Sequence, residues 1–181
     1  MSDISFGSSR TSDADLVRYA YDRGIDYFDT AESYEGGESE EAVGKGLEGV
    51  RDRVTVVSKT HCGPDTSRGE LGKSLDASLK RLRTDHVDIY LNHAVNGIDR
   101  LKNPAWPEFV ASAKQAGKIR FSGMSGHGGR LVECLDYALD HDLADVILIA
   151  YNFGQDPSFL QSLTRSFDFI AMQPDLPRVL K

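Results

Sequence analysis

The stretch Ile25-Asp26-Tyr27-Phe28-Asp29-Thr30-Ala31-Glu32-Ser33-Tyr34 decides how the rest of this chain is interpreted. It begins as a strand, because apolar and aromatic residues alternate with polar ones directly after Gly24, which ends a helical pattern. It runs into the acidic, glycine-rich loop Tyr34-Glu35-Gly36-Gly37-Glu38, so Asp29 lies at the strand's carboxyl end and Tyr34 in the loop beyond. An acid and a tyrosine are by themselves typical of a surface loop. In parallel α/β proteins, however, active sites are built at this end of the strands.

An alternation of strand and helix is repeated six times along the chain. Hydrophobic periodicity predicts strands at residues 4–7, 25–29, 53–59, 87–91, 118–124 and 146–149. It predicts helices near residues 12–24, 39–48, 67–82, 106–116, 131–139 and 157–163, and it leaves 169–172 ambiguous between a strand and a buried turn. Capping boxes are expected at Ser12 with Asp15 and at Ser67 with Glu70.

This alternation indicates an α/β fold with a parallel sheet and right-handed crossovers. A doubly wound nucleotide-binding sheet would carry a glycine fingerprint after its first strand, and Phe6-Gly7-Ser8-Ser9-Arg10 is not one. We therefore expect a (β/α)₈ TIM-barrel type of fold. Such barrels run to about 250 residues and rarely fall below about 200, so residues 1–181 are expected to form a single barrel domain that is incomplete and lacks the last two βα units.

Composition excludes several classes of function. The 181 residues are 40% hydrophobic and carry a formal net charge of −7, with no Lys/Arg cluster, which disfavours nucleic-acid binding. Cys62 and Cys134 have neither metal-finger nor disulfide spacing, which fits a reducing cytoplasm. No signal peptide is visible at the start, and no apolar run approaches the ~20 residues of a membrane span. We expect a cytoplasmic protein with no nucleic-acid or membrane partner.

Four polar side chains lie at the ends of three consecutive predicted strands: Asp29 with Tyr34, then Lys59, then His93. Individually, a strand-end lysine is usually solvated and such a histidine is usually a hydrogen-bonded rim residue. Jointly they suit proton donation to a carbonyl. The pKa of a tyrosine, about 10 in water, is expected to be lowered by a buried Lys59 that Asp29 holds in place, while His93 orients the substrate oxygen.

These residues belong to segments that resemble signature motifs of the aldo-keto reductases. In chain order the segments are Phe28 to Tyr34 with Glu40 to Gly44, Val57 to Thr60, Asp85 to His93, and Gly117 to Ser125. The similarity extends from about Phe6 to Asn152. It implies an NADPH-dependent oxidoreductase that reduces a small-molecule aldehyde or ketone, with the cofactor bound without a Rossmann motif.

The resemblance also implies roles for individual residues. Tyr34 is expected to be the general acid, Lys59 and Asp29 to tune it, and His93 to position the carbonyl. The cofactor NADP is expected at Asp29, Ser125, Gly126 and Ser8.

The chain departs from the family pattern in three respects. Ser125-Gly126 stands where the family usually has Ser-Asn for the nicotinamide carboxamide, and Leu148 stands where a glutamine is common. The sequence ends at Lys181, before the family's seventh and eighth units, which carry the ring-stacking aromatic residue and the basic groups for the adenosine phosphate.

Two other functions compete with the reductase. A metal-dependent barrel hydrolase would use Asp29, His61, Cys62, His93 and His127, although no two histidines share ligand spacing on one element. A non-catalytic relative would keep the scaffold as a cofactor-sensing or interaction module. Whatever its function, the incomplete barrel is expected to leave two unpaired strand edges, which favour self-association.

Overall fold

The structure, a computed structural model, describes residues 1–150. The predicted helix at 157–163 and the ambiguous segment 169–172 lie outside the described residues. Six parallel strands form one sheet in sequential order, as predicted. They are β1 (Phe6–Gly7), β2 (Tyr27–Asp29), β3 (Thr55–Thr60), β4 (Val87–Asn92), β5 (Ile119–Gly126) and β6 (Val146–Ile149).

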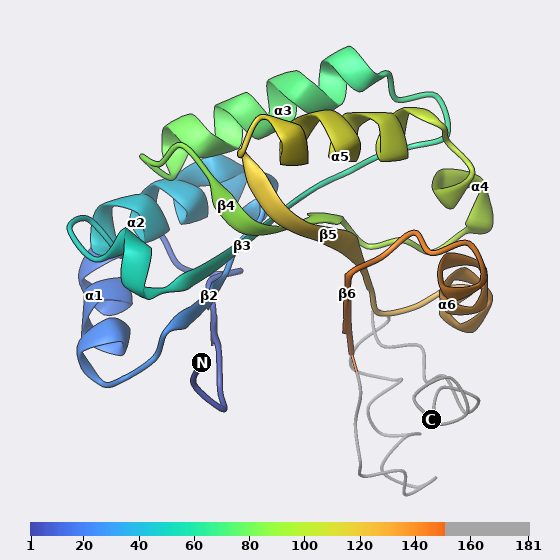
Figure 1. The fold of residues 1–181 in the computed structure, drawn as a ribbon. Coiled ribbons are helices and arrows are strands. Elements are labelled where there is room, and N and C mark those ends of the chain that lie inside the picture. The colour runs from blue at the N-terminus through green and yellow to red at the C-terminus, as the bar shows by residue number, and fades with distance from the viewer. Residues whose placement is uncertain (151–181) are drawn as a thin grey trace, which may run out of the picture.

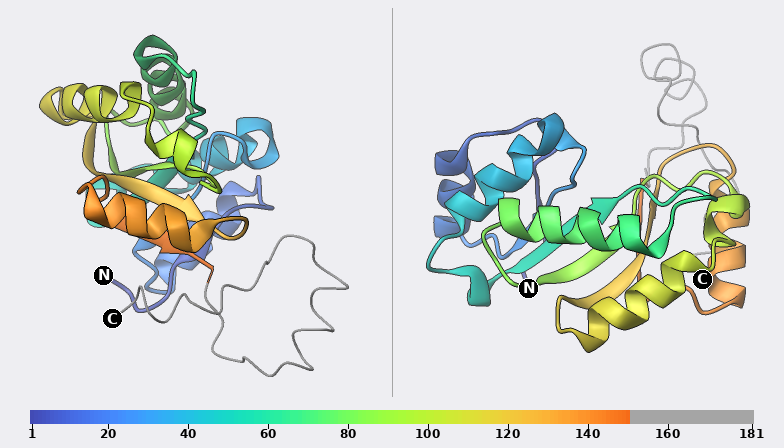
Figure 2. Two further views of the ribbon diagram at one scale, coloured as in Figure 1. Left: turned by 90° about the vertical axis from the view of Figure 1, so that its right-hand side faces the viewer. Right: turned by 90° about the horizontal axis from the view of Figure 1, so that it is seen from above.

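The sheet curls into a half-barrel, and the helices cover its convex side (Figure 1). They are α1 (Ala14–Asp22), α2 (Glu38–Gly46), α3 (Arg68–Arg81), α4 (Ile98–Leu101), α5 (Ala105–Gln115) and α6 (Leu131–Asp140). Two short 3₁₀ helices, η1 (Tyr34–Gly37) and η2 (Arg51–Arg53), precede α2 and β3. Figure 2 shows the same row of helices from above, with α1 and α6 at its two ends. The fold is an incomplete (β/α)₈ barrel, which confirms the predicted class. Within residues 1–150, no helix is both long and apolar enough to cross a membrane.

Strand alternation produces two apolar layers. Residues on the convex face, such as Phe28, Val56 and Tyr90, pack with the apolar stripes of α2, α3 and α5 in the main core. The next residues along the same strands turn to the concave face, where Val57, Ile89 and Leu91 form a smaller cluster. This alternation places the side chains of Asp29 and Lys59 on the concave side, in line with Val57.

The N-terminal caps of α3 and α1 confirm one predicted capping box and show that the other was wrong. Ser67 and Glu70 form the predicted capping box at the start of α3. The expected box between Ser12 and Asp15 is absent, because α1 starts one residue later and Asp13 caps it instead, accepting from the backbone N–H groups of Asp15 and Leu16. The carboxylate of Asp13 satisfies two free N–H groups of the first turn.

The other differences concern element boundaries. β5 continues to Gly126, so Ser125 and Gly126 belong to a strand and not to the predicted loop, because the ladder to β6 extends to that residue. The strand containing Asp29 is shorter than predicted and begins at Tyr27. The segment after Tyr34 forms the single turn η1 instead of an open loop, and α4 was not predicted because four residues are too few to show a period.

Candidate active site

Tyr34, Lys59, Asp29 and His93 lie in one cluster at the carboxyl ends of β2, β3 and β4. The ammonium Nζ of Lys59 is 2.6 Å from Asp29 Oδ1 and 3.4 Å from the Tyr34 hydroxyl. The predicted salt bridge between Lys59 and Asp29 is therefore present, and both side chains point to the same face of the sheet. Tyr34 reaches the pair from the start of η1, which follows β2 in the chain.

Lys59 is almost completely buried, with 1% of its surface exposed. Burial lowers its pKa, and the adjacent Asp29 carboxylate opposes this change. Burial likewise raises the pKa of Asp29, and Lys59 opposes it. A further bond from Nζ to the carbonyl of Thr30, at 2.7 Å, holds the ammonium group in place. Each charge in the pair is thus maintained mainly by the other.

The pKa of Tyr34 does not shift in the direction that the sequence led us to expect. Burial, followed by the negative charge of Asp29, raises the pKa of Tyr34 to about 12. The expected decrease is absent because burial disfavours the charged phenolate, and the negative charge of Asp29 disfavours it further. Tyr34 is consequently a protonated phenol at neutral pH, with an ammonium group beside its oxygen.

His93 faces Tyr34 edge-on, with 5.4 Å between the ring centroids and 79° between the ring planes. Burial, and then the charge of Lys59, lowers the pKa of His93 to about 3. The imidazole is therefore neutral at physiological pH. Its Nδ1 atom lies 3.4 Å from Ser33 Oγ, so when the hydroxyl donates to Nδ1, the ring proton resides on Nε2.

A buried carboxylate supports the strand that carries Lys59. Glu40 on α2 is fully buried, and it accepts hydrogen bonds from Ser58 Oγ at 2.5 Å and from Arg81 Nε at 2.6 Å. Sequence reasoning placed Glu40 in a motif but assigned it no role. Its helical spacing to the inward-facing Val43 and Leu47 was the available signal, because an acid on an apolar helix face requires a buried partner.

The predicted cofactor residues occupy different positions. Ser8 is fully buried, and its hydroxyl donates to the Asp29 carbonyl at 2.8 Å. The hydroxyl of Ser125 accepts from the N–H of Ala94 at 3.0 Å. At Gly126 a Cβ atom would lie 2.5 Å from a methyl group of Leu131, so this position is closely packed. The roles of these residues toward a cofactor remain predictions.

The side chains proposed for a metal site include close neighbours, but within residues 1–150 they do not form a set of metal ligands. His61 stacks on His93 with 4.9 Å between the ring centroids, while Cys62 is buried and free. Among residues 1–150, no group of three or more His, Cys, Asp or Glu side chains is arranged to hold a metal ion. The geometry of this part of the chain does not support the hydrolase alternative.

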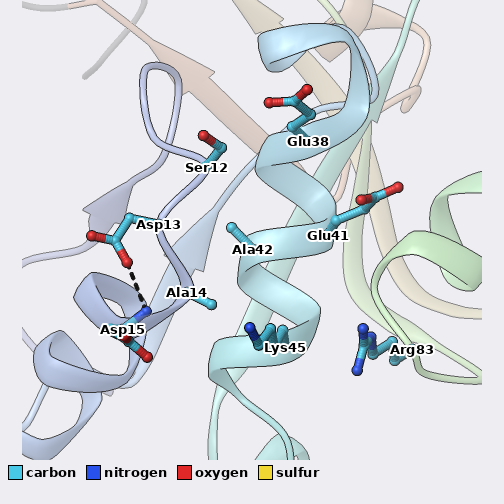
Figure 3. Close-up of a pocket in the computed structure, with 9 residues that line it drawn as sticks. All are labelled: Ser12, Asp13, Ala14, Asp15, Glu38, Glu41, Ala42, Lys45 and Arg83. Carbon is cyan, nitrogen blue, oxygen red and sulfur yellow. Dashed lines mark hydrogen bonds between the residues drawn. The ribbon is translucent and has the colours of Figure 1, made fainter.

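A pocket lies elsewhere, on the helical side of the molecule between the start of α1 and the length of α2 (Figure 3). It measures about 590 Å³ and is lined by Ser12, Asp13, Ala14, Asp15, Glu38, Glu41, Ala42, Lys45 and Arg83. Asp13 points back to the N–H of Asp15, which it caps. None of the four clustered residues lines this pocket.

Comparison with known proteins identifies the family. The model of the aldo/keto reductase family matches residues 5–154. The chain belongs to this family. It is 35% identical to L-galactose dehydrogenase of Arabidopsis thaliana over 87% of this chain and 52% of that protein, and 35% identical to a methylglyoxal reductase of Escherichia coli over 72% of this chain and 42% of that protein. The chain thus spans about half the length of the curated relatives it matches.

Solved structures agree with this family assignment. An aldo-keto reductase of Bacillus halodurans in its holo form superposes with a TM-score of 0.68 at 26% identity, over 91% of this chain and 58% of that one. A Klebsiella pneumoniae reductase in complex with NADP and acetate superposes with a TM-score of 0.64 at 27% identity, over 87% of this chain and 59% of that one. Relatives in this family are thus crystallised with NADP, the cofactor expected from the sequence.

Proposed function

We propose that this protein reduces an aldehyde or ketone to an alcohol with NADPH, using Tyr34 as the general acid. One observation carries the proposal: a protonated phenol lies 3.4 Å from a buried ammonium group, which is itself paired with Asp29 at 2.6 Å. The arrangement sits at the strand ends of a barrel whose solved relatives include an NADP complex. An aldehyde or ketone is the substrate that accepts a proton on oxygen as it is reduced.

The residues present fit a nicotinamide cofactor. Asp29 Oδ2 is buried and has no hydrogen-bond partner among residues 1–150, although such an oxygen is costly to leave unpaired. A hydroxyl donor of a bound ribose would satisfy it. When bound, the cofactor supplies a hydride for the carbonyl carbon. We also place the protein in the reducing cytoplasm, which suits its two free, buried cysteines.

Tyr34 supplies the proton in this proposal. As negative charge develops on the substrate oxygen, the phenolic proton moves to that oxygen, and the adjacent Lys59 ammonium stabilises the phenolate that remains. The raised pKa of Tyr34, about 12, keeps the proton available until the substrate's own charge draws it away. Neutral His93 donates a hydrogen bond from Nε2 to the same oxygen and orients it.

The test is Tyr34→Phe in the whole protein, assayed by NADPH oxidation with a panel of aldehydes and ketones that includes methylglyoxal. We expect kcat to fall by about 10²–10⁴-fold, the usual value of general acid catalysis, while NADPH binding measured by fluorescence is retained. Tyr27→Phe is the matched control, because this half-buried tyrosine lies on the same strand as Asp29 and is not among the hydrogen-bond partners of Lys59 within residues 1–150. A loss below tenfold for Tyr34→Phe would falsify the assigned role. No oxidation of NADPH by the wild-type protein with any carbonyl would overturn the function.

A further inference from the structure

Arg100 connects the segment that follows β3, the strand of Lys59, with the end of β4, which His93 directly follows. Its guanidinium donates to the carbonyl oxygen of Cys62 at 2.9 Å and to the carbonyl oxygen of Ala94 at 2.7 Å. The same group donates to the side-chain oxygen of Asn92 at 2.8 Å and to the carbonyl of His93 at 2.9 Å. One side chain on α4 therefore holds the segment after β3, the last residue of β4 and the two residues that follow it.

The backbone held by Arg100 has an unusual conformation. Ala94 directly follows His93 and has a φ of +53°, in the left-handed region that residues with a Cβ atom rarely adopt. Its carbonyl accepts from Arg100, and its N–H donates to Ser125 Oγ at 3.0 Å. Hydrogen bonds thus hold both the carbonyl and the N–H group of the strained residue Ala94. Because Ala94 directly follows His93, its conformation helps to set the direction of the His93 ring.

All four acceptors of Arg100 are uncharged oxygens, and within residues 1–150 the guanidinium forms no ion pair. The guanidinium therefore holds these backbone and amide oxygens in place by hydrogen bonds, and it does not neutralise a buried acid. An arginine suits this arrangement because its planar guanidinium presents five donors in a fixed fork, whereas a lysine has three donors on a flexible stem.

We propose that Arg100 is a positioning residue of the reductase site, which holds the His93 ring in its edge-on arrangement against Tyr34. The importance of this arrangement for catalysis rests on the proposed function. The arrangement itself can be observed without cofactor, substrate or turnover.

The experiment is NMR spectroscopy of the whole protein with labelled histidine and tyrosine, at neutral pH. The wild-type protein is expected to show nuclear Overhauser cross-peaks between the rings of His93 and Tyr34, whose centroids are 5.4 Å apart. In Arg100→Met we expect these cross-peaks to be lost. Arg100→Lys restores some of the donors, so we expect it to retain part of the cross-peak intensity, which also provides a second variant if Arg100→Met does not fold.

Arg51→Met is the matched control. Arg51 is also a partly buried arginine that donates to two backbone carbonyls, of Val54 and His86, but it lies at the opposite end of the strands and pairs with Asp88. We expect Arg51→Met to lower the stability of the fold and to keep the cross-peaks. Unchanged cross-peaks in Arg100→Met, or an equal loss in Arg51→Met, would overturn the proposal. Absence of carbonyl reduction by the wild-type protein would overturn only the proposed function.

Discussion

At the scale of the residue, the protonation of His93 below neutral pH depends on folding. Burial, and then Lys59, lowers its pKa from 6.5 to about 3. Between these values the unfolded chain binds a proton that the folded protein excludes, so stability must fall as the pH falls through this window. We expect His93→Gln to reduce this loss by up to about 1.4 kcal/mol per pH unit, measured by urea unfolding at several pH values. An unchanged pH dependence in the variant would contradict the neutral, buried state of His93.

At the scale of the element, the pairing of β5 with β6 depends on the absence of a side chain at Gly123. A Cβ atom there would lie 1.8 Å from the carbonyl oxygen of Val146 on the neighbouring strand. Because this neighbour is backbone, Gly123→Ala must force the two strands apart, and we expect a loss of about 2–4 kcal/mol in the free energy of unfolding. Chemical denaturation measures the change.

Gly72→Ala is the control for this substitution. Gly72 lies inside α3, and no heavy atom would lie within 4 Å of an added Cβ. We expect a gain of roughly 0.5–1 kcal/mol there, because alanine is the better helix former. Equal effects at the two glycines would show that backbone flexibility, and not the close approach of β5 and β6, determines the result.

At the scale of the whole molecule, the half-barrel has two edges and an open concave face. Within residues 1–150, β1 and β6 each pair on one side only, and Phe121 and Leu148 are 45% and 36% exposed. Both residues lie on the same side of the sheet as Ile89, the concave one. Unpaired edges beside exposed apolar residues favour association, so we propose that this chain self-associates through the β6 side.

Light scattering after size-exclusion chromatography, over a range of concentrations, tests this proposal. We expect Leu148→Lys to shift the protein toward the monomer. Leu139→Lys should have no such effect, because Leu139 is 52% exposed on α6, on the outer side of the sheet. A wild-type protein that stays monomeric at every concentration would refute the association, and an equal effect of the two lysines would refute the assigned face.

The amino-acid sequence by itself determined the order of the elements and the residues that meet at the site. Local periodicity defines each strand, and parallel strands have their carboxyl ends at the same end of the sheet. Asp29, Lys59 and His93 were therefore expected to lie close together once their strand ends were identified. The capping box of Ser67 and Glu70 could be predicted for the same reason, because it depends only on residues three apart. Local periodicity does not determine boundaries such as the end of β5, because pairing with the next strand sets them.

Only the tertiary structure decided the electrostatics of the site and the residues that support it. The pKa of Tyr34 rises because of burial and then the charge of Asp29, and both depend on depth and on distances between strands. Arg100 carries no pattern in the sequence that links it to His93, since its acceptors are mostly backbone oxygens that any residue provides. Such contacts form between segments that are distant in the chain, and only the packed fold brings a donor within reach of them.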